Sequence, residues 1–421
     1  MEVIMKYVKF ILILFISLGL FAKDLFMGFG ESTSPEPSVA LREAYNMLPN
    51  DVKEPDFCVI FLTENYNLKE ILNEANKLMP NTKLYGETSC LGIGTPNGFI
   101  ITKNGSLGIL AFKSKRITFG VGISKNPDGF LAGKEVITNA IKNAGKTLND
   151  KPNLVLISPT PGKEEYILKG IESVIGKDVP IFGGTAGDNA IAGKWNVFVN
   201  DDFTNSGVAV AVIYTDLKIG YAYISGYQTM EKFGVVTGAK ERTIFTINNK
   251  PAGQVYNDWC DGIFSKEMNS GASILGPASF YPLARKVIEE KGVQYITLHP
   301  SRINPNDKSL EVFAKVNVRD TIYLLKGDKS ILLSRPVSVA MKAFYEGGLT
   351  AENLRGGIFI YCAGTMLAVK DELGALGFPP LIKALNSKPF LTAFTFGEQG
   401  FYKKLGNFHG NLMCSIVLFG E

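Results

Sequence analysis

The sequence holds few of the residues from which metal and catalytic sites are usually built. Its 421 residues include two histidines, His299 and His409, and no Cys-x-x-Cys pair. Two isolated histidines lack metal-site spacing, and without Cys-x-x-Cys neither a zinc knuckle nor a thioredoxin-type redox site is supported. Gly28-Phe29-Gly30 lacks the third glycine of a dinucleotide fingerprint, and Gly162-Lys163 lacks the first glycine of a P-loop. We therefore predict no metal and no cofactor.

Charge of one sign is not concentrated anywhere along the chain. Lys plus Arg number 44 and Asp plus Glu number 40, which gives a net charge of +4. No basic run or aromatic–basic stripe is present, so nucleic-acid binding is not expected. The hydrophobic fraction of 46% is enough for a sizeable core, and the length predicts about two or three domains.

The apolar run near the start of the chain is too short for a comfortable membrane span. It covers Phe10–Ala22, follows Lys6 and Lys9, and ends at Lys23. This pattern is typical of a signal peptide, here residues 1–22, cleaved after Ala22. It predicts a periplasmic or secreted protein. The alternative is an uncleaved signal segment that anchors the chain to the inner membrane, which would be its only membrane contact.

The five cysteines are an odd number, so at least one must stay free or pair between chains in an oxidising compartment. Cys58 and Cys414 lie in apolar runs and are predicted to be core thiols. Cys90 and Cys260 lie in polar, loop-like surroundings and are predicted to be the more reactive thiols.

Short β-branched runs alternate with amphipathic helices, and the pattern occurs twice before residue 215. The run 55–61 matches 152–158 at a spacing of 97 positions. We predict an α/β fold with mixed sheets flanked by helices, whose N-terminal domain is an internal duplication of a βαβαβ-hairpin unit. Chance similarity between two strand–helix units is the alternative.

A second α/β domain is predicted to follow, which gives domains at 24–245 and 246–421. Met230–Arg242 is rich in glycine and charge and is predicted to be the connection between them. A fainter third copy of the unit is predicted to begin at the strand Thr321–Leu325. In that copy Phe396-Gly397-Glu398 takes the place of Tyr85-Gly86-Glu87.

The stretch Pro180–Asn189 is the strongest candidate for a ligand site. An apolar strand ends there in small residues, and Gly183 and Gly184 would let a ligand carboxylate approach the backbone N–H groups near Thr185. Asp188 would then accept the ligand's amine. The alternatives are a tight turn with nothing bound and an Asp188 that caps its own loop.

Four further residues are predicted to complete this site. Thr88 and Ser89 offer hydroxyls from the matching loop of the first copy, and Glu398 and His409 would close the site from the second domain. Glu398 could instead cap a neighbouring loop by accepting backbone N–H groups, and His409 could stabilise its own polar loop.

At several of these segments the sequence resembles the FIST family, which pairs a FIST N domain with a FIST C domain. The resemblance implies a sensory, small-ligand-binding module of bacterial signal transduction, with amino acids as proposed ligands and no enzymatic activity. The family often has Arg after Cys-Ala-Gly, where this chain has Thr365, so ligand identity cannot be carried over. The matching segments are Gly86-Glu87-Thr88-Ser89, Pro180–Asp188, Ile247–Pro251, Tyr281-Pro282-Leu283, Tyr361-Cys362-Ala363-Gly364, Phe396–Gly400 and Asn407–Asn411.

The sequence thus favours an exported binding protein that reports a small-molecule ligand to an unidentified signalling partner. Two other hypotheses stay open. One is a hydrolase or transferase that uses Cys90 or His409. The other is an interaction protein with no small ligand.

Overall fold

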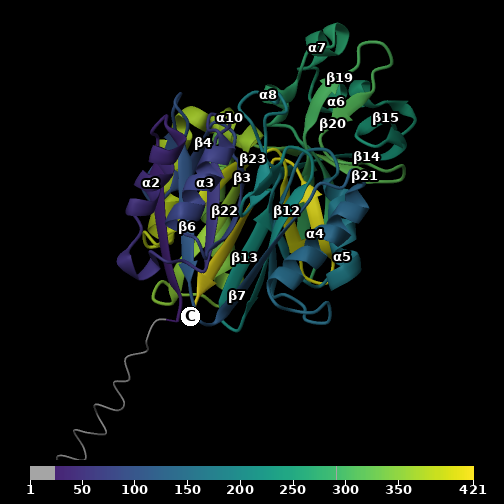
Figure 1. The fold of residues 1–421 in the computed structure, drawn as a ribbon. Helices are drawn as coiled ribbons and strands as arrows, with labels where there is room; N and C mark the ends of the chain where they lie inside the picture. Colours follow the sequence, from purple (N-terminus) through teal and green to yellow (C-terminus); the bar gives the residue numbers. More distant parts are fainter. Residues whose placement is uncertain (1–23, 291) are drawn as a thin grey trace, which may run out of the picture.

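The structure is a computed structural model that describes residues 24–290 and 292–421 (Figure 1). The predicted signal peptide lies outside the described residues. In the part of the chain that is described, no helix is long and apolar enough to cross a membrane. The architecture is mixed α/β, with helices against mixed sheets, which confirms the predicted fold class.

Three sheets of the core share one strand order, and each contains one parallel pair between its third and fourth strands. The first sheet carries helices α2 (Pro37–Asn46) and α3 (Leu68–Leu78). Its strands are, in spatial order, β1 (Phe26–Ser32), β6 (Leu107–Lys113), β2 (Phe57–Leu62) and β3 (Lys83–Thr88).

The second sheet repeats this order with helices α4 (Gly129–Asn143) and α5 (Glu164–Ile175). Its strands are β7 (Ile117–Ser124), β12 (Val208–Thr215), β8 (Leu154–Pro159) and β9 (Ile181–Gly184). The third has the helices α9 (Lys329–Gly347), α10 (Ala363–Glu372) and α11 (Phe378–Ala384). Its strands are β13 (Lys218–Ile224), β26 (Cys414–Gly420), β22 (Leu354–Cys362) and β23 (Phe390–Thr395).

Each of the three units sends a hairpin to the sheet of another unit, so the exchange closes into a pseudo-threefold ring. Every hairpin pairs with the fourth strand of its host sheet, which would otherwise be an open edge. The hairpin β4 (Gly92–Thr95)–β5 (Gly98–Ile101) pairs with β23, β10 (Val197–Val199)–β11 (Asp202–Thr204) with β3, and β24 (Glu398–Tyr402)–β25 (Gly406–Gly410) with β9.

The pairing registers of the first two units differ by the spacing found in the sequence. Ile60 lies opposite Gly86, and Ile157 lies opposite Gly183, 97 positions on. That the two units arose by duplication stays a prediction.

The third unit is present, but two of its predicted positions are wrong. Its first strand is β13, whereas Thr321–Leu325 belongs to a different sheet. In the first two units, Glu87 and Gly184 pair with the hairpin of a neighbouring unit. The residue at the equivalent place in the third unit is Ala393. Phe396-Gly397-Glu398 therefore does not take the place of Tyr85-Gly86-Glu87.

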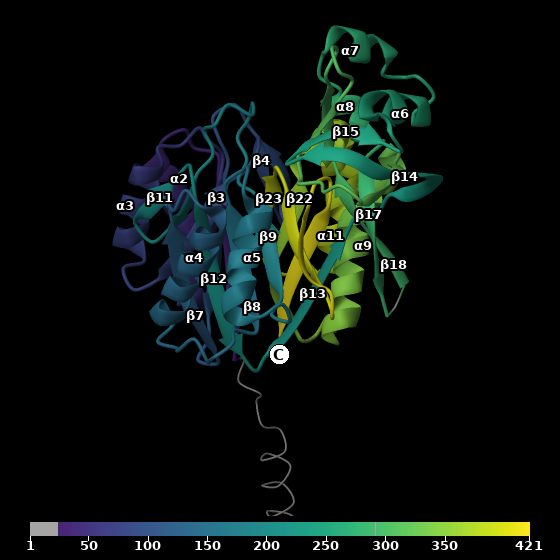
Figure 2. The ribbon, with the colours of Figure 1, turned by 90° about the vertical axis from the view of Figure 1, so that its right-hand side faces the viewer.

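An inserted domain lies between β13 and α9 and projects from one end of the core (Figure 2). It has its own hydrophobic core, and its sheet is the largest in the molecule as described. Its elements are β14 (Gln228–Lys240), β15 (Thr243–Ile247), β16 (Lys250–Pro251), α6 (Ala252–Trp259), α7 (Ser265–Ser270), α8 (Leu275–Ala278), β17 (Leu283–Glu289), β18 (Gly292–Leu298), β19 (Pro300–Ile303), β20 (Leu310–Val312) and β21 (Thr321–Lys326).

The prediction that Met230–Arg242 is a connection is wrong, because most of it forms β14. This strand pairs with β21 along one part and with β15 along another, and register shifts interrupt both pairings. Glycine is common where strand pairing is irregular, so the glycine and charge of this segment did not indicate a strand. The predicted domains 24–245 and 246–421 stay a prediction; in space, β13 from before that boundary joins strands from after it.

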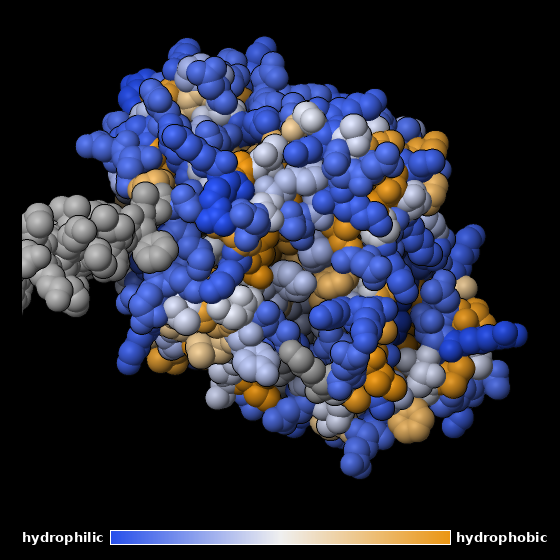
Figure 3. Space-filling view, turned by 90° about the horizontal axis from the view of Figure 1, so that it is seen from below, coloured by the Kyte–Doolittle hydropathy of each residue, from blue (hydrophilic) through white to orange (hydrophobic). Residues whose placement is uncertain are grey.

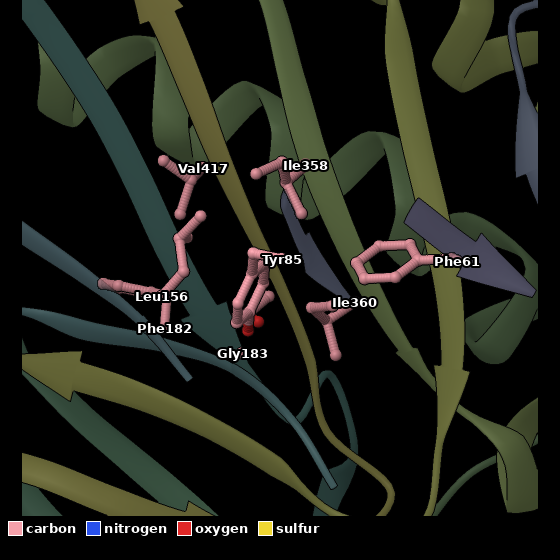
Figure 4. A pocket seen from close by; sticks show the side chains of 9 residues that line it. Phe61, Tyr85, Leu156, Phe182, Gly183, Ile358, Ile360 and Val417 are labelled. Carbon is pink, nitrogen blue, oxygen red and sulfur yellow. The ribbon is translucent and has the colours of Figure 1, made fainter. Parts of the chain in front are cut away.

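The inner faces of the three core sheets meet in one central cluster of buried side chains. A cavity of only about 10 Å³ remains there, among apolar side chains such as Tyr85, Phe182 and Ile360 (Figure 4). This is about the space of one water molecule, so the centre is a packed core and holds no ligand site. Hydrophilic residues cover most of the surface at the end of the core that carries the C-terminus, opposite the inserted domain (Figure 3).

All five cysteines are buried and free. This confirms Cys58 and Cys414 as core thiols. Burial raises the pKa of both Cys90 and Cys260 to about 12, so the expectation that these two thiols are reactive is wrong.

Candidate functional site

A cavity of about 240 Å³ lies between the core and the inserted domain. On the core side it is reached by segments that follow the carboxyl ends of β3, β8, β9, β22 and β23, the location at which α/β sheets commonly hold ligands. The core residues that line it are Cys90, Pro161, Glu164, Asp188, Asn189, Ala190, Ile191, Trp195, Cys362, Gly364, Leu367 and Phe396. The inserted domain adds Arg242, Leu275, His299 and Phe313.

Three backbone hydrogen bonds tie the ends of the fourth strands together beside this cavity. The N–H of Gly187 donates to Thr88 O, that of Phe396 to Thr185 O, and that of Cys90 to Phe394 O, each at 2.9 Å. One bond comes from each pair of neighbouring units. The pseudo-threefold ring therefore fixes the positions of Cys90, Asp188 and Phe396 at the cavity wall.

An ion cluster joins the two parts of the molecule at the cavity. Arg242 Nη2 donates to Glu164 Oε2 at 2.6 Å and to Glu165 Oε2 at 3.2 Å. The N–H of Lys315 donates to Glu165 Oε1 at 2.6 Å. Burial alone would raise the pKa of Glu165, but the neighbouring His409 and Arg242 and the Lys315 N–H lower it to about 2. In the described chain, no partner contacts Nε or Nη1 of Arg242, which leaves donors for a ligand.

His299 adds a neutral acceptor to the inserted domain's side of the cavity. Burial lowers its pKa to about 4, so the ring is uncharged at neutral pH. Its Nε2 lies 2.9 Å from the carbonyl oxygen of Leu275 and 3.3 Å from Ser279 Oγ. Because a carbonyl can only accept, Nε2 carries the proton and Nδ1 is left as an acceptor.

Asp188 lines the cavity, but its oxygens are already used by its own loop. They accept from the N–H groups of Ala190 at 3.1 Å, Ala192 at 2.8 Å and Lys194 at 2.9 Å. These contacts match the alternative in which Asp188 caps its loop. A direct role toward a ligand amine stays a prediction.

Gly183 and Gly184 are explained by strand packing. A Cβ on Gly184 would lie 2.2 Å from Thr395 Cγ2, and one on Gly183 would lie 1.8 Å from Ile157 O. Neighbouring atoms occupy the space that these glycines free, so the expectation that they open a path for a ligand is wrong. Neither residue lines the 240 Å³ cavity.

Thr185 and His409 lie just behind the cavity wall, in a buried chain of polar contacts. Thr185 Oγ1 donates to Glu164 Oε1 at 3.3 Å. Gln399 Nε2 lies 3.0 Å from both Thr185 Oγ1 and His409 Nδ1. These contacts connect a lining carboxylate to a histidine that itself does not reach the cavity.

The remaining predicted site residues bond to the backbone. Thr88 Oγ1 accepts from Asn196 N–H at 2.9 Å, and Ser89 Oγ accepts from Phe394 N–H at 2.8 Å. Glu398 accepts from Met413 N–H at 2.8 Å and from Thr395 Oγ1 at 2.9 Å, and burial raises its pKa to about 8. Of the eight predicted ligand residues, only Asp188 lines the cavity.

Sequence reasoning missed all four lining residues of the inserted domain and most of those of the core. Arg242 lies in a segment predicted to be a connection, and His299 is an isolated histidine, so no spacing signals them. At the position where the family often has Arg, Thr365 accepts a hydrogen bond at 3.2 Å from the buried Arg335 of α9. Among residues 24–290 and 292–421, no group of three His, Cys, Asp or Glu side chains could hold a metal.

Known proteins resemble this chain to different degrees. The uncharacterized protein MJ1623 of Methanocaldococcus jannaschii is 25% identical over 210 residues, which are 47% of this chain and 40% of that protein. The chain thus matches less than half the length of this relative. A cyanuric acid hydrolase from A. caulinodans aligns over 94% of this chain and all of its own, with 7% identity and a TM-score of 0.39. A second cyanuric acid hydrolase structure covers 48% of this chain and 72% of its own, with 10% identity and a TM-score of 0.28. Such scores mark a distant resemblance only.

Two family matches cover most of the described chain, in the order that the sequence resemblance predicted. The FIST N domain matches residues 56–250, and the FIST C domain matches residues 252–401. FIST domains are sensory domains of signal transduction. The chain therefore belongs to the FIST family.

Proposed function

We propose that this protein is an exported sensory protein that binds a small ligand, an amino acid, in the cavity between the core and the inserted domain. It acts in signal transduction through a partner protein. The observation that carries the proposal is the 240 Å³ cavity, to which both parts of the molecule contribute polar and aromatic side chains. Its volume lies just below the usual range for drug-sized ligands and suits a smaller metabolite.

The polar groups in the cavity match the two charged ends of an amino acid. The free guanidinium donors of Arg242 would bind the carboxylate. Glu164 and the Nδ1 acceptor of His299 would receive the ammonium group. The two parts of the molecule thus supply complementary groups to one ligand.

A ligand between two parts of a protein can change how those parts sit against each other. A molecule that contacts Arg242 and Glu164 together would favour the arrangement in which both are in reach. This bias is the signal that a partner would detect. The predicted signal peptide supports a periplasmic or secreted location for the encounter.

The proposal includes no enzymatic activity. Cys90 lines the cavity, but with a pKa of about 12 its thiol stays protonated and is a poor nucleophile. His409 does not line the cavity and contacts Gln399 through Nδ1. Neither observation favours a hydrolase or a transferase.

A thermal-shift screen of the mature protein against amino acids and small metabolites tests the proposal, because a ligand that binds the folded state raises the melting temperature. Calorimetry would then compare Leu367→Trp, which fills the cavity, with Leu376→Trp. Both leucines are about half exposed, but only Leu367 lines the cavity. We expect Leu367→Trp to abolish binding and Leu376→Trp to retain it. A screen without any hit, or equal binding by both variants, would overturn the proposal.

A further inference from the structure

We propose that the cavity selects amino acids with an uncharged, branched aliphatic or aromatic side chain and rejects those with an acidic side chain. The inference rests on the proposed function, and it names the class of ligand that the function leaves open. It follows from two features of the lining residues. One is an apolar wall in which the polar side-chain groups of Trp195 and Asn189 already have hydrogen-bond partners, and the other is an excess of negative charge.

The apolar wall is built from both parts of the molecule. On the core side, Trp195 and Phe396 meet edge to face, with ring centroids 6.1 Å apart. Leu367 continues this side, and Leu275 and Phe313 face the cavity from the inserted domain. A ligand side chain that buries carbon against these surfaces gains from the removal of apolar area from water.

Polar groups within this wall already have partners. Trp195 Nε1 donates to Asn205 O at 3.1 Å, so its single donor is used. Asn189 accepts from Leu91 N–H at 2.7 Å, and its Nδ2 contacts Asn65 Oδ1 at 3.4 Å. Arg242, Glu164 and His299 would hold the carboxylate and ammonium groups of the ligand. A polar side chain on the ligand would then lose its hydrogen bonds to water and gain none from the wall.

The balance of charge disfavours a second carboxylate on the ligand. Two carboxylates, Glu164 and Asp188, line the cavity against one guanidinium, and Glu165 bonds to the same guanidinium from behind. Arg242 is therefore already surrounded by negative charge. A zwitterion adds no net charge, whereas an acidic side chain would be repelled by the carboxylates that already line the cavity.

Leucine, asparagine and aspartate make a sharp set of probes, because their side chains have nearly the same shape and differ in polarity and charge. Calorimetry with the mature wild-type protein should give a dissociation constant for leucine at least about tenfold below that for asparagine, a difference of about 1.4 kcal/mol. Aspartate should show no measurable heat. Phenylalanine competes with leucine if the aromatic wall is used.

A polar substitution in the wall tests the cause of this preference. Leu367→Gln should weaken the binding of leucine and reduce the ratio of the dissociation constants for asparagine and leucine to less than about threefold. Leu376→Gln should leave this ratio unchanged, because Leu376 does not line the cavity. Tighter binding of aspartate than of leucine, lost in Leu367→Trp, would overturn this inference and leave the proposed function standing. If no amino acid binds the folded wild-type protein, the proposed function fails and this inference fails with it.

Discussion

Arg242 of the inserted domain and Glu164 of the core meet with 2.6 Å between Nη2 and Oε2, and this pair links the two parts of the molecule. The Glu164 side chain is almost fully buried, and that of Arg242 is about one-quarter exposed. In an ion pair that is withdrawn from water, removal of one partner leaves the charge of the other buried without compensation.

We expect Arg242→Ala to lower the free energy of unfolding by about 3 kcal/mol, as for other buried pairs that lose one partner. Urea denaturation would measure it. Arg116→Ala is the control, because Arg116 pairs with Asp24 and Asp216 at the exposed surface and should matter much less. Equal losses in the two variants would contradict an energetic link at Arg242.

Stability should fall as the pH rises through the neutral range. Burial raises the pKa of Glu398 from 4.5 to about 8 in the folded protein. Between these values the folded state holds a proton that the unfolded state has released, so each rise in pH favours unfolding. Burial and the charge of Glu398 also raise the pKa of Glu87, which acts in the same direction.

Melting temperatures measured from about pH 6.5 to pH 8 would test this relation, because below pH 6.5 the lowered pKa of the buried His299 acts in the opposite direction. Glu398→Gln should flatten the decline, and the double variant with Glu87→Gln should flatten it further. A stability that rises with pH over this interval in the wild-type protein would show that the two carboxyl groups are ionised in the fold.

Asp188→Ala should loosen the loop that forms one wall of the cavity. Three N–H groups, those of Ala190, Ala192 and Lys194, would lose their acceptor. The expected loss of stability is about 1–3 kcal/mol. Hydrogen exchange should accelerate at residues 190–194, and Asp188→Asn, which keeps an acceptor oxygen, should be milder. Unchanged exchange in this loop would contradict the capping role.

Thiol labelling should separate the folded from the unfolded protein sharply. All five cysteines are buried, and burial raises the pKa of Cys90 and Cys260 to about 12. We expect almost no reaction of the native protein with an aromatic disulfide reagent and five equivalents in denaturant. Fast labelling of Cys90 in the native protein would contradict this expectation and show that its thiol is reactive.

The sequence predicts individual elements of the core well, because their patterns are local. Phe57–Leu62 is a continuous apolar run, and Leu68–Leu78 is an amphipathic helix whose Asn67 accepts the N–H of Lys69. Each segment has in the structure the bounds that its sequence pattern indicates. Local patterns cannot show which sheet a hairpin joins, so the exchange between units was not predicted.

The predicted site residues and the candidate cavity lie at the same end of the core, but of the eight predicted residues only Asp188 lines the cavity. Both follow from the carboxyl ends of strands, since that rule depends on topology alone. The lining residues come from distant segments that meet only through the fold. A glycine that makes room for Thr395 and one that makes room for a ligand look alike in a sequence, and Gly184 is the former.

The exchange of hairpins also orders events during synthesis. The hairpin β4–β5 lies in the first quarter of the chain, but its partner β23 lies in the last tenth. The first sheet can be completed once β11 has been made, about halfway along the chain, but the second and third sheets need strands from its last tenth. Such distant pairing slows folding, because the entropy of closing a long loop must be lost before the contacts form.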